Sequence, residues 1–344
     1  MDKYVLTVVI PTYNRAETLR TTLSFVIPQV VAHKDEVHIY ISDNASTDNT
    51  KEVVKEIMSE NLDIITYFCQ EKNLTASPNF NDAVHRVNSE YVYLLSDDDI
   101  IVPECITFML RCIKENAEVN YFYVNQYVAS EKMDDVMLWN QNFGLSYLKK
   151  YDTGGEMLKE HFEGPSCCSA NLFKRELWIN ATKYIKEDCP GYVWLSILLH
   201  GAVNVKTAYI TYPMFVAKMP KVQRYSDNWP WYHVKGMGQL FKYLDNFHPG
   251  LYDAWIHHQQ VVNKRHFLMV LCSMSRNKKL YRKRIAEIKM HVKYPIARLI
   301  CDISISFIPR WFIMGPLYQS IRVYRVFELF KAKIKAKIKA KIKR

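Results

Sequence analysis

The sequence predicts an α/β fold with a mostly parallel sheet flanked by helices, because strand and helix patterns alternate four times in the first hundred residues. The first segment, residues 5–10, is an almost unbroken apolar run, which is typical of a parallel strand buried on both faces. Polar residues gather where such runs end, most densely at Asp97–Asp99. Ligands of parallel α/β sheets bind at the carboxyl ends of the strands, so this edge is the predicted site.

The predicted elements follow one another at regular intervals. Four apolar runs that each end in polar residues are the predicted strands: 5–10, 37–41, 64–68 and 91–95. Leu19, Leu23 and Val26 share one face of the helix expected after the first run. The later helix starts are indicated by capping residues or first-turn prolines, which are Thr47 or Asp48, Ser77–Pro78 and Pro103.

The acidic run has two possible explanations. Three adjacent carboxylates raise one another's pKa, so a fold keeps them at a strand end mainly where a cation neutralises them. Mg²⁺ and Mn²⁺ favour such oxygens and share them with substrate phosphates. Alternatively, the run is an acidic turn that caps the helix near Pro103. Other polar residues are expected at the same edge and favour a binding site: Arg15, Asp43 and Asn73.

Three ordered motifs carry a resemblance to a known family. They are Ile10-Pro11-Thr12-Tyr13-Asn14-Arg15, Ile41-Ser42-Asp43-Asn44-Ala45-Ser46-Thr47-Asp48, and the acidic run four residues before Pro103. Together they resemble the family 2 glycosyltransferases, which implies the GT-A nucleotide-sugar-binding fold with a C-terminal helical extension. The resemblance covers roughly residues 4–215. The second motif is most similar to bacterial transferases that assemble O-antigen and related surface polysaccharides, including abequosyltransferase-like members.

The resemblance implies a nucleotide-sugar pocket and a divalent metal, Mn²⁺ or Mg²⁺. The pocket residues that it implies are Pro11, Tyr13, Arg15, Asp43, Asn73 and Asp97. The family's metal signature, Asp-x-Asp-Asp, corresponds here to Ser96-Asp97-Asp98-Asp99, so serine replaces the first aspartate. Asp98 falls on the metal-ligand position with Asp99 beside it, and Asp97 would act through the ribose or a metal-bound water.

The resemblance also implies a catalytic base, which in the family is usually an Asp just before an apolar helix that ends in glycine. Here that helix is predicted over residues 193–201, and the acidic pair before it is Glu187-Asp188, about two residues further upstream than usual. Asp188 is the candidate base and Glu187 its alternative, unless the pair is an ordinary acidic loop. Three basic residues after the strand-like segment 208–212 either contact the donor diphosphate or are solvated: Lys218, Lys221 and Arg224.

Glycine and cysteine usage argues against other classes. All ten glycines lie at Gly144 or later, so the first α/β region has neither a dinucleotide fingerprint nor a phosphate-binding loop. This argues against a dehydrogenase or P-loop enzyme and leaves a sugar nucleotidyltransferase as a distant alternative. The eight cysteines include no Cys-x-x-Cys, which is typical of reduced thiols rather than of a disulfide framework or zinc site.

Much of the charge lies in the C-terminal tail. The formal net charge is +11, but residues 331–344 carry seven lysines and Arg344, which leaves +3 elsewhere. At about 1 kcal/mol per basic residue the tail is a plausible anchor on an anionic membrane surface, although a solubilising tail is the alternative. Residues 303–321, with only Arg310 charged, are expected to lie in the membrane interface or to form a core helix. Nucleic acid is not expected, because the tail has no aromatic residues.

The sequence as a whole predicts three regions: a catalytic domain over residues 1–225, a helical and partly amphipathic region over 226–330, and the Lys-rich tail 331–344. The resemblance implies metal-dependent transfer of a sugar from a nucleotide-sugar donor to a lipid-linked, polyprenyl-diphosphate-bound oligosaccharide. No signal peptide precedes the first strand, so a cytoplasmic enzyme, peripheral on the inner membrane face, is expected. The alternative is a catalytically inactive, membrane-tethered binding scaffold of the same fold.

Overall fold

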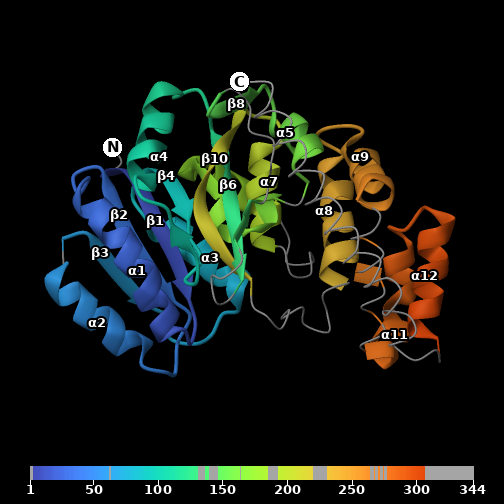
Figure 1. The fold of residues 1–344 in the computed structure, drawn as a ribbon, viewed down its shortest axis with the longest axis horizontal. Helices are drawn as coiled ribbons and strands as arrows, with labels where there is room; N and C mark the ends of the chain where they lie inside the picture. The colour runs from blue at the N-terminus through green and yellow to red at the C-terminus, as the bar shows by residue number, and fades with distance from the viewer. Residues whose placement is uncertain are drawn as a thin grey trace, which may run out of the picture. The chain divides into compact units, whose positions relative to one another are not determined.

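The computed structural model of this chain describes eleven segments, which are residues 3–61, 63–130, 136–138, 146–162, 164–184, 193–219, 231–263, 267, 270–271, 274 and 277–306. The chain divides into two compact units. Unit 1 comprises Met1–Arg224 and Leu240–Leu251, and unit 2 comprises Tyr225–Gln239 and Tyr252–Arg344. The sheet belongs to unit 1, whereas the described part of unit 2 is helical (Figure 1).

The first four strands confirm the predicted parallel layer. They are β1 (Tyr4–Thr12), β2 (Val37–Asp43), β3 (Ile65–Cys69) and β4 (Ser89–Leu94). They lie in the order β3-β2-β1-β4, and each neighbouring pair is parallel (Figure 1). The chain therefore moves outward from β1 to β3 and then returns to the other side of β1. The strand order reverses between β1 and β4, and ligands of open α/β sheets bind outside the carboxyl ends at such a reversal.

The other half of the sheet is mixed rather than parallel. Its strands are β5 (Ile100–Ile101), β6 (Tyr121–Ser130), β7 (Val136–Leu138), β8 (Leu148–Tyr151), β9 (Asn171–Lys174) and β10 (Thr207–Met219). The long strands β6 and β10 are parallel, but β9 runs antiparallel between β4 and β6. The short strands β5, β7 and β8 also pair antiparallel. Parallel pairing is thus found among β1 to β4 and between β6 and β10. The short strands β5, β7, β8 and β9 pair antiparallel with their neighbours and complete the sheet.

Helices cover both faces of this sheet. Those that matter here are α1 (Ala16–Val31), α2 (Thr50–Glu60), α3 (Ala76–Arg86), α4 (Cys105–Glu115), α5 (Gly154–Glu160), α6 (Arg175–Thr182) and α7 (Val193–Ala202). Right-handed crossovers put α1 and α2 on one face and α3 on the other. In agreement, α1 contacts α2 and α4, whereas α3 contacts α6 and α7. Residues 6–10 of β1 are all buried, so the prediction of a strand covered on both faces is confirmed.

The helix starts bring polar groups to the same edge. Asp48 accepts hydrogen bonds from Thr50 N at the start of α2 (3.1 Å) and from Ala16 N at the start of α1 (3.3 Å). The capping position of α2 is occupied by Asn49, which makes no side-chain cap hydrogen bond, so neither Thr47 nor Asp48 is the cap residue. Asp48 nevertheless links the N-termini of α1 and α2 beside the ends of β1 and β2. Ser77 is not the cap of α3, because it lies inside the helix and Thr75 occupies the capping position without a side-chain hydrogen bond.

The described residues of unit 2 form short helices around their own core. They include η3 (Trp231–Gly236), α9 (Leu251–His257, whose first residue belongs to unit 1), η4 (His258–Val262), α11 (Lys278–Lys289) and α12 (Pro295–Ile305), while α8 (Met237–Leu244) continues into unit 1. Tyr281, Ile288 and Cys301 are among the buried core residues. None of the helices in the described ranges is long and apolar enough to cross a membrane. The predicted tail 331–344 and interfacial residues 307–321 lie outside the described residues.

The described cysteines are not paired with one another. Within the described ranges, six cysteines are present, and all carry free thiols: Cys69, Cys105, Cys112, Cys167, Cys168 and Cys301.

Candidate functional site

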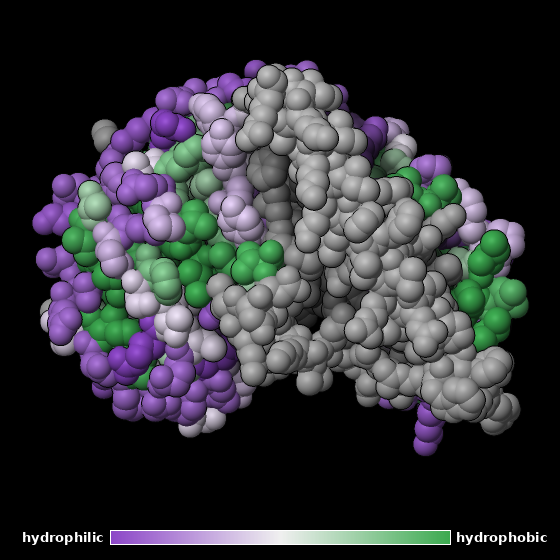
Figure 2. Space-filling model, in the orientation of Figure 1, coloured by the Kyte–Doolittle hydropathy of each residue, from purple (hydrophilic) through white to green (hydrophobic). Residues whose placement is uncertain are grey.

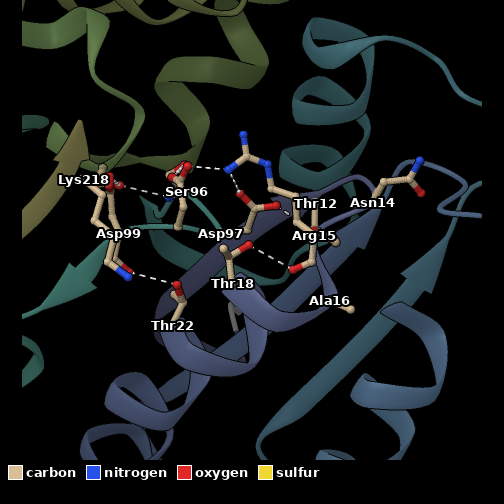
Figure 3. A network of polar contacts seen from close by, with 12 residues as sticks. Thr12, Asn14, Arg15, Ala16, Thr18, Thr22, Ser96, Asp97, Asp99 and Lys218 are labelled. Atoms are coloured by element: carbon tan, nitrogen blue, oxygen red, sulfur yellow. Dashed lines mark hydrogen bonds and ion pairs between the residues drawn. The ribbon is translucent and has the colours of Figure 1, made fainter. Parts of the chain in front are cut away.

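The ends of β1 and β4 meet through Thr12, Arg15 and the acidic run. Thr12 Oγ1 at the end of β1 donates a hydrogen bond to Asp97 Oδ2 after β4, at 2.7 Å (Figure 3). Arg15 begins the loop-to-helix junction of α1, and its Nη1 lies 3.8 Å from Asp97 Oδ1. The same nitrogen donates to Asp98 Oδ2. Two carboxylates of the acidic run therefore share one guanidinium group at the reversal of strand order.

Asp98 is the most open of the three aspartates. Its side chain is 30% exposed, against 9% for the side chain of Asp97, and Asp99 is buried. Ser96 Oγ donates to Asp98 Oδ1 at 2.7 Å, so the serine that replaces the family's first aspartate orients the candidate metal ligand. Of the acidic run, Asp98 is thus the residue that an incoming ligand can reach most directly.

Asp99 contacts a different set of groups. Its carboxylate accepts hydrogen bonds from Ser169 Oγ (2.6 Å) and from the backbone N of Lys218 on β10 (3.3 Å). Its backbone oxygen accepts a bond from Thr22 Oγ1 of α1 at 3.0 Å (Figure 3). Ser169 Oγ in turn accepts a hydrogen bond from Ser96 N at 2.9 Å. Asp99 and Ser169 therefore tie the acidic run to three other parts of unit 1.

Burial is the main influence on the protonation of the buried aspartates. It raises the pKa of Asp97 to about 6, although the hydrogen bond from Thr12 and the charge of Arg15 act the other way. Burial also raises the pKa of Asp99 to about 7. The charge of Asp98 adds to both shifts, so the predicted mutual repulsion is present but is not the largest cause. Burial alone would lower the pKa of Arg15, but the neighbouring carboxylates outweigh it and raise that pKa.

The chemistry of these groups fits a hard divalent cation. Asp97 and Asp98 direct carboxylate oxygens at one positively charged group, and Asp98 is partly open to solvent. Across the described segments, no three His, Cys, Asp or Glu side chains form a group that could hold a metal ion. Mg²⁺ is commonly held by one or two carboxylates together with substrate phosphates and water, so two protein ligands are sufficient.

A second polar cluster lies at the ends of β2 and β3. Asp43 is buried, and its Oδ1 accepts hydrogen bonds from Ser46 N (2.9 Å) and Ser46 Oγ (2.6 Å). Its Oδ2 accepts a bond from Tyr67 OH at 2.6 Å. Asn44 Nδ2 donates to Asn73 Oδ1 at 3.1 Å. The predicted pocket residues Asp43 and Asn73 therefore both belong to this cluster.

The loops at this edge hold unusual backbone conformations without glycine. Positive φ angles occur at Asn14 (53°), Ala45 (62°) and Thr75 (68°), which follow β1, β2 and β3. Such conformations cost about 1 kcal/mol or more in residues other than glycine, and they concentrate at ligand-binding loops. Asn14 is held by Ser46 Oγ, which accepts from its backbone N, and by Thr47 N, which donates to its Oδ1. The first two loops are therefore locked to each other.

The remaining predicted residues are only partly described. Pro11 lies within β1 opposite Ser42 of β2, and the side chain of Tyr13 is exposed just after β1. Lys218 lies on β10, and its backbone rather than its ammonium group contacts Asp99. Four other predicted residues lie outside the described residues: Glu187, Asp188, Lys221 and Arg224.

Sequence reasoning missed three residues that organise the site. Thr12 stands inside the first motif, so its place at a strand end was a usable signal. Tyr67 lies one residue before the end of a predicted strand, but nothing in the strand's pattern indicates a hydrogen bond to Asp43. Ser169 lies 70 positions from Asp99, and no local pattern connects the two.

Sequence comparison matches residues 7–178 to the family model "Glycosyl transferase family 2". The chain is 26% identical over 163 residues to an uncharacterized glycosyltransferase of Methanocaldococcus jannaschii, covering 47% of this chain and 53% of the relative. It is 32% identical over 111 residues to the abequosyltransferase RfbV of Salmonella typhimurium, covering 32% of this chain and 33% of the relative. The chain thus spans about half and about a third of the lengths of these two relatives.

A third relative is an Escherichia coli protein named UDP-Glc:alpha-D-GlcNAc-diphosphoundecaprenol beta-1,3-glucosyltransferase WfgD, which is 24% identical over 205 residues, covering 59% of this chain and 74% of the relative. Among solved structures, Staphylococcus aureus TarS 1–349 in complex with UDP-GlcNAc has a TM-score of 0.55 at 12% identity, covering 90% of this chain and 92% of that chain. The mannosyltransferase PcManGT of Pyrobaculum calidifontis, in complex with GDP-Man and Mn²⁺, has a TM-score of 0.50 at 16% identity, covering 87% and 83%. These structures share the fold of this chain.

Proposed function

Because this chain belongs to glycosyl transferase family 2, we propose that it transfers a sugar from a nucleotide-sugar donor to a hydroxyl group of a polyprenyl-diphosphate-linked oligosaccharide. The observation that carries the proposal is the meeting of Arg15, Asp97 and Asp98 at the reversal of strand order. The acceptor class is supported by relatives whose names specify undecaprenol-linked substrates, WfgD and a Campylobacter jejuni glucosyltransferase that is 27% identical over 218 residues. The product would serve O-antigen or another bacterial surface polysaccharide.

The donor binds along the carboxyl edge of the sheet in this proposal. Asp43 and Asn73 border the base and ribose, and the exposed ring of Tyr13 is available for stacking. Arg15 keeps its charge at any physiological pH, because the carboxylates beside it raise its pKa. It neutralises Asp97 and Asp98 and so keeps the two carboxylates close together before a donor arrives. Three basic residues are proposed to contact the diphosphate: Lys218, Lys221 and Arg224.

The acidic run is proposed to hold the divalent metal. Asp98 is the direct ligand, because it is the partly exposed carboxylate, and Asp97 contributes directly or through water. Such an ion stabilises the negative charge that develops on the diphosphate leaving group. Thr12 and Ser96 hold the two carboxylates in place, and Asp99, which is bound to Ser169 and Lys218, supports the run from within the protein.

The transfer step also requires a base. The acceptor oxygen forms a bond to the anomeric carbon, the bond from that carbon to the diphosphate oxygen breaks, and the acceptor hydroxyl gives its proton to a carboxylate. We propose Asp188 for this role, with Glu187 as the alternative, because both precede α7 in the sequence. General-base assistance of this kind contributes about 10²–10⁴-fold to the rate.

The test is nucleotide release from UDP-, GDP-, CDP- and dTDP-sugars with Mn²⁺ or Mg²⁺, with bacterial membrane extract as the acceptor. We expect release of one nucleoside diphosphate that requires the metal and falls at least about 100-fold in Asp98→Asn, which removes the ligand charge but keeps the side-chain size. Asp35→Asn, at an exposed position, is the matched control and retains activity. Donor binding without any turnover would instead support the inactive scaffold.

The same proposal places the enzyme on the cytoplasmic face of the membrane, where residues 331–344 act as a basic anchor. Seven lysines and Arg344 would each add about 1 kcal/mol of attraction near an anionic leaflet. Deleting these residues is therefore expected to weaken binding to anionic vesicles without lowering donor hydrolysis in solution.

A further inference from the structure

Helix α12 of unit 2 is apolar on two sides. One side carries Ala297 and Cys301, which are buried in the core of the unit. Another side carries Ile296 and Leu299, one turn apart, and these side chains are 70% and 58% exposed. Met290, in the turn that leads to α12, is 63% exposed. Single exposed apolar residues are ordinary, but a group of them marks a contact surface.

We call Met290, Tyr294, Ile296 and Leu299 the α12 patch. Figure 2 shows apolar side chains gathered on the surface over α12, at the right-hand edge of the view. The patch includes one aromatic residue, Tyr294, which directly precedes the helix and is also exposed. A helix that buries one side in its own unit and exposes a second apolar side has a surface that can contact a lipid bilayer or another protein.

Hydrogen bonds hold the patch in a defined shape. Gln260 Oε1 accepts bonds from Lys293 N (2.9 Å) and Tyr294 N (3.1 Å), and its Nε2 donates to His291 O at 2.7 Å. Arg298 Nε donates to Val292 O at 2.7 Å. The turn before α12 and the first turn of the helix are therefore fixed, so the exposed apolar residues belong to a preformed surface.

The chain around the patch is strongly basic. Residues 277–306 contain eight Lys and Arg residues and two acidic residues, Glu287 and Asp302, and Lys293 of this segment is paired with Asp253 of α9. Both acidic side chains are already paired, Glu287 with Lys235 and Asp302 with Lys289. Basic side chains also lie at both ends of α12, where Arg298 contacts Val292 O and Arg282 Nε donates to Ile305 O at 3.0 Å. A binding partner for this surface must therefore offer both apolar groups for the aliphatic side chains and negative charge for the basic side chains.

We propose that the α12 patch docks on an anionic lipid surface. Ile296 and Leu299 would enter the boundary between headgroups and acyl chains, and Tyr294 would lie at headgroup level, where tyrosine is enriched. The surrounding basic residues would contact anionic headgroups. The combination of an aliphatic centre and a basic border favours this occupant over a second copy of the chain, whose identical positive charges would repel. The inference concerns unit 2 and does not depend on the acidic site of unit 1.

The test is co-sedimentation of the full chain with phosphatidylcholine vesicles, with or without phosphatidylglycerol. The double variant Ile296→Ser/Leu299→Ser is compared with Phe25→Ser/Val31→Ser, which removes two exposed apolar residues from α1 of unit 1. We expect the patch variant to bind phosphatidylglycerol vesicles at least about tenfold more weakly, which corresponds to about 1.4 kcal/mol. The control should bind like the wild type, and added salt should weaken wild-type binding.

All proteins are also measured without residues 331–344, because the basic tail could mask the effect of the patch. The α12 patch predicts the same relative loss in this background. Equal binding of the patch variant and the control in both backgrounds would overturn the inference. So would self-association of the wild type that the patch substitutions abolish without changing vesicle binding. Nucleotide release with membrane extract as the acceptor is measured in parallel: patch-dependent vesicle binding without nucleotide release from any donor leaves this inference standing and rejects the proposed transferase.

Discussion

At the residue scale, three identical side chains in a row acquire three different roles. Asp97 is held by Thr12, Asp98 is held by Ser96 and Arg15, and Asp99 is held by Ser169. The run itself and its place after a strand were predictable from the sequence. The division of roles was not, because the partner of Asp97 lies 85 positions away and the partner of Asp99 lies 70 positions away.

Ser169 is the single residue whose removal tests this arrangement. Ser169→Ala removes the donor to Asp99 Oδ2 and the acceptor for Ser96 N, and both of these groups lose their partner in a largely buried place. We expect the free energy of unfolding to fall by about 2 kcal/mol, measured by denaturant titration. Ser59→Ala, which removes an exposed hydroxyl from α2, is the control. Equal stability of the two variants would contradict a positioning role for Ser169.

At the element scale, short loops and turns rather than helices shape the site. Ser169 belongs to η2 (Cys168–Ala170), which follows η1 (Gly164–Ser166) and precedes β9. Asn171, at the start of β9, is buried and donates from Nδ2 to the carbonyl oxygens of Pro165 (3.1 Å), Cys167 (2.7 Å) and Cys168 (3.0 Å). Its Oδ1 accepts a hydrogen bond from Tyr121 OH at 2.7 Å. One amide thus organises the segment that presents Ser169 to Asp99.

Asn171→Asp tests this organisation with almost no change in side-chain size. The carboxylate can still accept from Tyr121, but it cannot donate to the three carbonyl oxygens and repels them instead. We expect a loss of about 3 kcal/mol or more in unfolding free energy. The control is Asn246→Asp, at an exposed position where the side-chain amide donates one hydrogen bond, to Tyr243 O. This substitution should change the free energy of unfolding by less than about 0.5 kcal/mol. A similar small loss in both variants would show that Asn171 does not hold the loop.

At the scale of the whole molecule, the buried histidines and the buried aspartates make the free energy of unfolding change with pH in opposite directions. Burial lowers the pKa values of His38 and His161 to about 4, so these groups favour the folded state above pH 6.5 and lose that contribution as the pH falls toward 4. Burial raises the pKa values of Asp97 and Asp99 to about 6 and 7. Their contribution is complete below their unfolded pKa and is lost as the pH rises through 6 to 7. A wild-type stability curve therefore sums two opposite slopes.

His161→Phe removes the contribution of one histidine to the pH dependence of stability and so allows it to be measured. The imidazole packs against both Tyr123 and Tyr209, with ring centroids 5.0 and 4.3 Å away, so an aromatic replacement keeps much of the packing. Between pH 7 and pH 5, without divalent ions, the free energy of unfolding of the wild type should fall by about 2 kcal/mol more than that of the variant. The reason is that His161 binds a proton in the unfolded chain over this range but stays neutral in the folded protein. The measurement is denaturant unfolding at both pH values. Identical losses would contradict the lowered pKa of His161.

What the sequence by itself determined was the α/β architecture, the parallel direction of the first strands and the edge at which the site lies. These follow from periodicity, from apolar runs and from motifs at strand ends, all of which are local. Only the tertiary structure decided which carboxylate is open, how β9 enters the sheet and which side of α12 remains exposed. The physical reason is that burial and hydrogen-bond partners come from segments far apart in the chain, so no local pattern encodes them.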